Sequence, residues 1–279
     1  MTGIIDVGGG LRGIFGTGVF DKLLENEISF DYMMGVSAGA ANIASFLGKQ
    51  KGRNLLFYTE YALRPEYMGF KNLLKNGSYL NLSYVYGTLS NSDGENPLDF
   101  KNMSSFKGQV ITVTTDAATG KAIYYPKGIY APDDYKILMA TCCLPIACRP
   151  INIDGHKYFD GGVADPIPIK KAVTDGCDKI VLILTRPKDE LRQAGVDKKA
   201  AFLLKRKYPE LAKALANRYM LYNESIKYAK MLEKEGKALI IAPDSRNGLK
   251  TLTKDTEKLM ALYKNGYEKA EEIIRFITE

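Results

Sequence analysis

The amino-acid sequence predicts an α/β protein with a parallel sheet covered by helices, on three observations. Apolar runs at 3–8 and 30–36 have the length of short strands, and each precedes a stretch with helical spacing. Apolar runs at 179–186 and 237–243 repeat this alternation later in the chain. Strands that alternate with helices typically form a parallel sheet. With 279 residues, 46% of them apolar, the chain is long enough to bury a sizeable core.

The first 126 residues contain the expected start of the sheet. Phe15, Val19, Leu23 and Leu24 recur at the spacing of one helix face. Residues 52–108 are rich in Tyr, Asn, Gly and Leu, which favours helices and long loops. The expected elements are strand 3–8, helix 13–27, strand 30–36, helix 38–49, the helices and loops of 52–108, and two strands within 109–126 joined by a turn at Thr119-Gly120.

The rest of the chain continues the pattern. Asp154-Gly155 between alternating apolar residues is typical of a tight hairpin, and Pro209 fits the first turn of a helix. The expected elements are helix 132–145 with Asp133 and Asp134 favourably placed at its N-terminus, hairpin 149–162, helix 166–177, strand 179–186, two helical stretches, strand 237–243, and one or two helices in 253–277. No linker-like change in composition interrupts this order. We therefore expect a single domain, 1–279, with a basic helical segment at about 187–236 and a C-terminal strand and helix.

The net charge of +7 is concentrated in one segment. Residues 186–237 hold fourteen Lys or Arg and seven Asp or Glu, an excess equal to that of the whole chain. Basic helices attract anionic surfaces. A solvated helix face and peripheral contact with an anionic membrane through 187–236 therefore both stay open, and nucleic acid is not an expected partner. An apolar stripe indicates that the last helix of this segment packs on the body: Leu211, Leu215, Tyr219, Tyr222, Ile226 and Ala229.

The composition favours an intracellular protein. The N-terminus has no basic region followed by a long apolar one, so no secretory signal is expected, and no apolar stretch is long enough to span a bilayer. Cys142, Cys143, Cys148 and Cys177 lack the spacing of a zinc site and are expected to be reduced and partly buried. We expect a cytoplasmic protein, either free or peripheral at the inner membrane surface.

Ser37 lies in a Gly-x-Ser-x-Gly pattern, Gly35 to Gly39, between strand 30–36 and helix 38–49. This is the order of a nucleophile elbow, in which the serine occupies a tight, strained turn and the glycines leave room for neighbouring chain. The start of the helix also offers backbone N–H groups to a developing oxyanion. The structural alternative is that Ser37 only caps the helix.

A second glycine-rich stretch, 8–13, follows the first strand. Its Gly8, Gly10 and Gly13 match G-x-G-x-x-G, a pattern of dinucleotide phosphate sites. Glycines at a helix start expose N–H groups that bind either a phosphate or an oxyanion. A dinucleotide site needs an acidic residue at the end of the second strand, whereas Asp31 lies at its beginning. A dinucleotide is therefore not expected.

A nucleophilic serine needs a group that accepts its proton. The single histidine, His156, lies on the same predicted strand as Asp160, and four extended residues rise about 13 Å, so the two cannot line one small site. Asp160 ends that strand, and Gly161 and Gly162 after it let other groups approach. A Ser37–Asp160 dyad is chemically sufficient where burial or donors position the carboxylate. The structural alternatives are a hairpin cap for Asp160 and a surface residue for His156.

Three motifs resemble those of the patatin-like phospholipase family in order and context: GGGLRG (8–13), GVSAG (35–39) and DGG (160–162). The segment 140–169 also resembles the family's segment around its aspartate. The resemblance extends over about residues 1–185, and the C-terminal region is similar to that of bacterial members. It implies a bacterial patatin-like serine acyl hydrolase with a three-layer αβα sandwich and a Ser–Asp dyad.

The resemblance also assigns roles to residues. It implies Ser37 as nucleophile and Asp160 as base, with the backbone N–H groups of Gly9 and Gly10 forming an oxyanion hole. We expect the N–H of Ala38, at the start of helix 38–49, to contribute to the same hole. The supporting motif residues are Gly8, Arg12, Gly13, Gly35, Gly39, Gly161 and Gly162. Arg12 fills the family's basic position, where it either aids anion binding or holds the loop.

The expected reaction is hydrolysis of carboxylic esters of lipids, of the phospholipase A or lysophospholipase type, without a metal or organic cofactor. The Tyr-rich region 52–90 is expected to line an acyl groove, and Cys142 and Cys143 are expected to serve packing. Two alternatives stay open: an acyltransferase on the same fold, disfavoured because Val36 stands where such transferases carry histidine, and a non-catalytic lipid-binding regulatory module.

Overall fold

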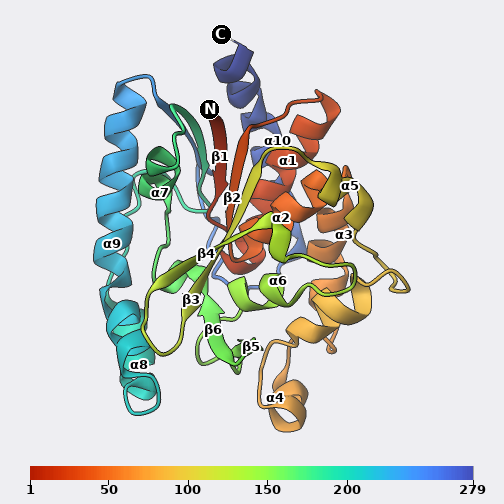
Figure 1. Ribbon diagram of the computed structural model, residues 1–279, viewed down its shortest axis with the longest axis vertical. Helices are drawn as coiled ribbons and strands as arrows, with labels where there is room; N and C mark the ends of the chain where they lie inside the picture. The colour runs from red at the N-terminus through yellow and green to blue at the C-terminus, as the bar shows by residue number, and fades with distance from the viewer. Residues whose placement is uncertain (279) are drawn as a thin grey trace.

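A computed structural model describes residues 1–278, and the sheet at its centre confirms the predicted α/β class (Figure 1). The strand order is β5-β6-β3-β2-β1-β7-β8, with β4 paired to β3. The five strands from β3 to β8 in that order pair in parallel, and β4, β5 and β6 are antiparallel additions. The strands are β1 (Thr2–Asp6), β2 (Tyr32–Val36), β3 (Gln109–Asp116), β4 (Ala122–Pro126), β5 (Ile151–Ile153), β6 (His156–Asp160), β7 (Lys179–Ile183) and β8 (Ala238–Ile241).

Helices cover both faces of the sheet, so the fold is the three-layer αβα sandwich that the family resemblance implied (Figure 1). Successive residues of a strand point to opposite faces: Ile4 packs with residues of α1, α2 and α10, whereas Ile5 packs with residues of α7 and α9. The longer helices are α1 (Ile14–Glu25), α2 (Ala38–Leu47), α8 (Gly195–Leu204), α9 (Pro209–Lys234) and α10 (Thr256–Thr278). The shorter helices are η1 (Gly10–Gly13), α3 (Arg53–Thr59), η2 (Tyr61–Leu63), α4 (Phe70–Asn76), η3 (Tyr84–Leu89), α5 (Phe100–Ser105), η4 (Lys127–Ile129), α6 (Lys136–Thr141), η5 (Gly161–Val163) and α7 (Ile169–Thr174).

The predicted elements are confirmed in kind, and the differences lie at their ends. The start of the helix predicted at 132–145 is wrong, because α6 begins only at Lys136. Asp133 has φ 58°, outside the helical region, and its carboxylate accepts hydrogen bonds from Ser92 N and Oγ, each at 2.7 Å. A carboxylate engaged in a tertiary contact is not available to support a helix start.

The two long C-terminal helices, α9 and α10, pack on the body of the protein. Helix α9 has Pro209 at its start, as predicted, and buries most of the predicted stripe, including Leu211, Tyr222 and Ile226. Helix α10 packs closely on α1, where a Cβ on Gly266 would lie 2.1 Å from Phe15 O. The single-domain organisation stays a prediction.

Among residues 1–278, no helix is both long enough and apolar enough to cross a bilayer.

Strand β3 brings two distant parts of the chain together. Thr112 pairs with Gly35 of β2 and with Tyr125 of β4, and Thr114 pairs with Asp160 of β6 and with Ile123 of β4. A strand has only two edges, so β2 and β6 lie end to end along the edge opposite β4. They approach from opposite directions, and their last residues, Val36 and Asp160, pair with the consecutive residues 113 and 114 of β3.

Candidate active site

Ser37 forms the turn between β2 and α2 that the elbow pattern predicted. Its φ of 55° and ψ of −133° are a strained combination for a residue with a Cβ, as expected of a nucleophile elbow. Ser37 N donates to Thr141 Oγ1 at 2.8 Å, and Thr141 Oγ1 donates to Val113 O at 2.5 Å. Thr141 of α6 therefore fixes the strained turn to β3. No feature of the sequence around Thr141 indicated this role.

Asp160 ends β6 and is almost completely buried. Gly162 N donates to Asp160 Oδ1 at 2.8 Å, and Thr115 Oγ1 donates to the Asp160 carbonyl oxygen at 2.8 Å. A Cβ on Gly161 would lie 2.1 Å from Val113 O, so the close fit of this turn requires glycine there. The Asp-Gly-Gly sequence thus holds the carboxylate in a defined orientation beside β3.

Ser37 and Asp160 line one cavity, as the shared edge of β3 requires. Burial raises the pKa of Asp160, and the Ser37 hydroxyl and Gly162 N–H oppose that rise. The Ser37 hydroxyl is thus near enough to affect Asp160, but among the hydrogen bonds of residues 1–278 the Asp160 carboxylate accepts one from Gly162 N and none from Ser37 Oγ. A buried carboxylate with a raised pKa has the character of a general base.

The three backbone N–H groups expected to form an oxyanion hole have no protein acceptor. Within residues 1–278, Gly9 N, Gly10 N and Ala38 N donate no hydrogen bond, whereas their neighbours Gly8 N and Leu11 N donate to Asp6 Oδ1 and Thr251 O. The glycine loop lies directly against the elbow, since a Cβ on Gly8 would be 2.8 Å from Ala38 N. N–H groups without an acceptor beside a serine can donate hydrogen bonds to an oxyanion and stabilise its charge.

Arg12 holds the glycine loop to two other segments. Its Nε donates to Thr185 O at 3.2 Å, and its Nη1 donates to Thr251 Oγ1 at 3.3 Å. The side chain is buried, and burial is the main cause that lowers its pKa to about 10, so it stays cationic at neutral pH. Of the two roles left open by the sequence, these contacts support loop positioning. They leave Nη2 without an acceptor among residues 1–278.

A buried carboxylate that we did not single out from the sequence supports the same loop. Asp6, at the end of β1, accepts from Gly8 N at 2.9 Å and from Asn42 Nδ2 of α2 at 2.8 Å. Asn42 Nδ2 also donates to Gly13 O at 2.9 Å. Burial raises the pKa of Asp6 to about 6. The only sequence signal was an acidic residue at the end of an otherwise apolar strand.

Two cavities of different character meet at Ser37. The first is mainly apolar, encloses about 730 Å³ of space that is partly open to solvent, and draws most of its wall from residues 52–90. Its apolar wall includes Phe57, Tyr58, Tyr67, Leu82, Val85 and Tyr86. The second is polar, encloses about 610 Å³ of space that is partly open to solvent, and is lined by Asp160 and four arginines. Ser37, Gly10 and Leu144 line both cavities.

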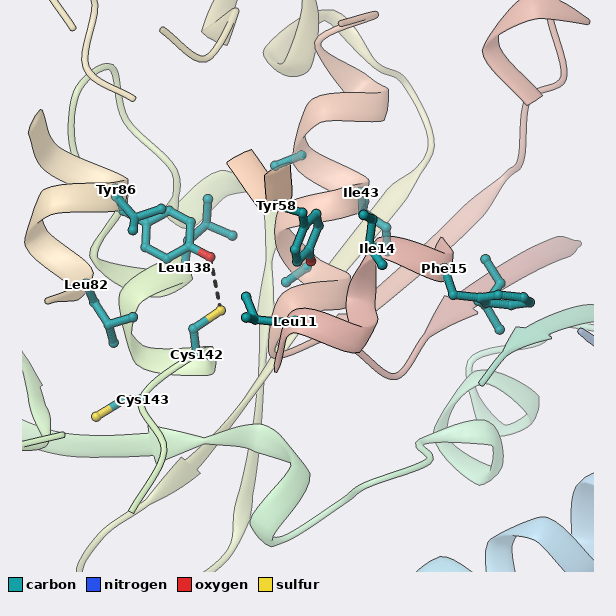
Figure 2. Close-up of a cluster of buried hydrophobic side chains, with 14 of the residues drawn as sticks. Leu11, Ile14, Phe15, Ile43, Tyr58, Leu82, Tyr86, Leu138, Cys142 and Cys143 are labelled. Atoms are coloured by element: carbon teal, nitrogen blue, oxygen red, sulfur yellow. Dashed lines mark hydrogen bonds between the residues drawn. The ribbon is translucent and has the colours of Figure 1, made fainter. Parts of the chain in front are cut away.

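Cys142 lies in the wall of the apolar cavity, where its thiol faces the Tyr86 hydroxyl at 3.1 Å (Figure 2). Burial raises the pKa of this thiol, so it is not a thiolate at neutral pH. Cys143 is also buried, and all four cysteines are unpaired. These observations agree with a packing role. His156 is exposed at the far end of β6 and lines neither cavity.

Comparison with known proteins assigns the chain to a family. The family model described as "Patatin-like phospholipase" matches residues 7–173, which is more than half of the chain, so this chain belongs to the patatin-like phospholipase family. A second model, "Domain of unknown function (DUF6363)", matches residues 208–279.

Individual relatives are distant. "Uncharacterized protein YjjU" of Escherichia coli is 28% identical over 193 residues, which cover 64% of this chain and 50% of YjjU. "Lysophospholipase nte1" of Emericella nidulans is 25% identical over 185 residues, which cover 65% of this chain and 12% of that protein. The chain thus spans half or less of the curated relatives it matches. The crystal structure of VipD from Legionella pneumophila has a TM-score of 0.50 at 15% identity and covers 98% of this chain and 66% of VipD, which supports the fold alone.

Proposed function

We propose that the protein is a serine acyl hydrolase that cleaves carboxylic esters of lipids, of the phospholipase A or lysophospholipase type, through a Ser37–Asp160 dyad. One observation carries this proposal: a serine in a strained elbow shares a cavity with a buried carboxylate and lies beside three N–H groups without acceptors. Burial raises the pKa of Asp160 toward the range in which a carboxylate accepts a proton readily. The lysophospholipase among the relatives agrees with this reaction class.

The mechanism follows from these positions. Asp160 accepts the proton of Ser37 Oγ while Oγ attacks the acyl carbonyl carbon, and the carbonyl oxygen takes up negative charge. The N–H groups of Gly9, Gly10 and Ala38 stabilise that charge. The bond to the alcohol breaks, and Asp160 returns its proton to the leaving oxygen. Water then attacks the acyl-enzyme, with Asp160 accepting its proton and returning it to Ser37, which releases the fatty acid.

Product analysis separates this proposal from its two alternatives. We expect incubation with a lysophospholipid to release free fatty acid, and fatty acid to stay the main product when excess glycerol is added as a competing acceptor. Gas chromatography of the acyl products measures the ratio. Acyl glycerol as the main product would instead identify an acyltransferase, and the absence of any cleaved ester in the wild type would leave a lipid-binding module.

Peripheral membrane contact through the basic segment stays a prediction, and the surface of α8 supports it. Val196, Phe202 and Leu203 are strongly exposed there, next to exposed cations such as Lys205 and Lys207. Exposed apolar side chains beside cations are typical of helices that lie on anionic lipid. We expect the fraction of protein that sediments with anionic vesicles to fall steeply as the salt concentration rises. Binding that is independent of salt would contradict this contact.

A further inference from the structure

The polar cavity beside Ser37 concentrates positive charge that the proposed dyad does not use. Four arginines from distant parts of the chain contribute to its wall: Arg12, Arg186, Arg192 and Arg218. Asp160 is the only acidic residue in that wall, within residues 1–278. Arg186 follows β7, Arg192 precedes α8, and Arg218 lies in α9, so most of this charge comes from outside the three sequence motifs.

Arg12 and Arg186 have few carboxylates near them to offset their positive charge. No ion pair among residues 1–278 includes Arg12, whose hydrogen bonds go to the neutral acceptors Thr185 O and Thr251 Oγ1. Arg186 Nη1 donates to Glu190 Oε1 at 2.6 Å. The same Glu190 also pairs with Arg246 at 2.6 Å, so one carboxylate serves two guanidinium groups. Glu190 itself does not line the cavity.

The other two arginines share one carboxylate in the same way. Arg192 Nε and Arg218 Nε donate to Asp197 Oδ2 at 3.2 and 3.0 Å, and Asp197 is buried and does not line the cavity. Arg192 Nη1 and Nη2 and Arg218 Nη1 have no acceptor among residues 1–278. These shared ion pairs hold the two guanidinium groups in place, and the remaining N–H groups are available to another acceptor.

The charges of the four arginines, of Arg246 and of the carboxylates that pair with them or share the wall do not cancel. Five guanidinium groups, counting Arg246, face three carboxylates, those of Asp160, Glu190 and Asp197, which leaves two positive charges in excess. Burial, and after it the neighbouring Arg218, lower the pKa of Arg192 to about 10. Partly buried cations in excess create a site for an anion, because an anion removes the repulsion and satisfies the free donors.

We propose that this arginine cavity binds the phosphate of a net-anionic lipid head group while the acyl chain occupies the apolar cavity, so that the scissile ester lies at Ser37. The proposal rests on the hydrolase function proposed above and names its substrate class. A phosphate monoester carries about −1.5 to −2 charges at pH 7, which matches the excess of two. Arginine binds phosphate through paired N–H donors.

The same charge predicts which head groups bind poorly. A phosphocholine group adds a fixed cation next to its phosphate, and that cation would lie near the guanidinium groups. A neutral glycerol head group provides no anion to offset the repulsion between them. We therefore expect the order of preference to be 1-acylglycerol 3-phosphate over 1-acylglycerol 3-phosphocholine and 1-acylglycerol with the same acyl chain.

Arg186→Gln is the most informative variant. Glu190 keeps Arg246 when Arg186 is removed, so no buried carboxylate loses its last partner. Arg186 is also not among the main groups that affect the pKa of Asp160, unlike Arg192 and Arg218. The matched control is Arg206→Gln, which removes the same charge from an exposed position in the turn between α8 and α9.

The kinetic test compares the three substrates below their critical micelle concentrations, so that binding to a charged surface does not contribute. We expect wild-type kcat/KM to be at least about tenfold higher for the phosphate-bearing substrate than for the neutral one. Arg186→Gln lowers that ratio by roughly tenfold, Arg186→Lys restores part of it, and Arg206→Gln leaves it unchanged. A wild-type ratio near one, or a ratio that Arg186→Gln does not change, would overturn the proposal.

A binding measurement decides the case without catalysis. In the Ser37→Ala protein, calorimetry is expected to detect binding of sn-glycerol 3-phosphate that weakens in the Arg186→Gln background and not in the Arg206→Gln background. If the wild-type protein cleaved no ester while this binding was present, the hydrolase function would be rejected and the anion subsite would stand. Equal binding of inorganic phosphate with no head-group preference in kinetics would identify a free-anion site and overturn the lipid assignment.

Discussion

Replacing Ser37 with alanine is expected to abolish ester cleavage and to leave the fold intact. The variant removes the attacking oxygen, and loss of a serine nucleophile typically lowers kcat by a thousandfold or far more. The measurement is hydrolysis of a p-nitrophenyl ester, with circular dichroism and thermal unfolding to check the fold. Since Ser37 has a strained backbone and alanine keeps the Cβ, we expect little change in stability. Asp160→Asn should lower the rate by a similar order.

His156→Ala is the matched control for this prediction. The histidine is exposed at the opposite end of β6 from Asp160 and lines neither cavity, so its removal should change turnover little. Full activity in Ser37→Ala would reject the dyad. A collapse of activity in His156→Ala would show that a histidine base acts after all.

Replacing Gly8 with alanine is expected to damage both stability and activity. Gly8 has φ 62°, and a Cβ there would lie 2.4 Å from Val36 O and within 2.8 Å of the N–H groups that begin α2. The methyl group would push the glycine loop away from the elbow and enter the space in front of Ala38 N. We expect a loss of roughly 3 kcal/mol or more in the free energy of unfolding, from backbone strain and overpacking together. A shift of about 1 Å in catalytic groups is enough to lower the rate about a hundredfold.

Gly155→Ala separates backbone strain from crowding. Gly155 also has a positive φ, 83°, but a Cβ there would meet no atom within 4 Å. Its substitution should cost only about 1–2 kcal/mol, the strain of a left-handed residue, and should leave activity unchanged. Denaturant unfolding and ester hydrolysis measure the two effects. Equal losses in both variants would mean that contact between the glycine loop and the elbow does not control the site.

The sequence predicted the order of elements well, because that order depends on local patterns. Apolar runs set the strands, and the glycines of 8–13 and 35–39 are required where the chain turns with a positive φ or passes close to itself. Asp154 and Gly155 both have positive φ, as the predicted tight turn demands. The start of α6 was missed because the contact of Asp133 with Ser92 is a tertiary one.

The contacts that support the site were harder to predict because they join residues far apart in the chain. Thr141 contacts Ser37 N across 104 positions, and Arg12 contacts Thr185 across 173. Neither residue lies in a pattern that identifies its partner. The juxtaposition of Ser37 with Asp160 requires β2 and β6 to share one edge of β3, which no local pattern determines. The net charge of 186–237 left a solvated helix face and contact with an anionic membrane both open, and the placement of Arg186, Arg192 and Arg218 around one cavity came only from the fold.

The most direct test of the central claim, that Asp160 activates Ser37 as a nucleophile, is mapping of a covalent adduct. The protein is treated with a fluorophosphonate, digested, and analysed by tandem mass spectrometry. We expect one phosphonylated peptide, modified at Ser37, with labelling strongly slowed in Asp160→Asn and absent in Ser37→Ala. An unlabelled Ser37 in the wild type, or labelling at an unchanged rate in Asp160→Asn, would contradict the account.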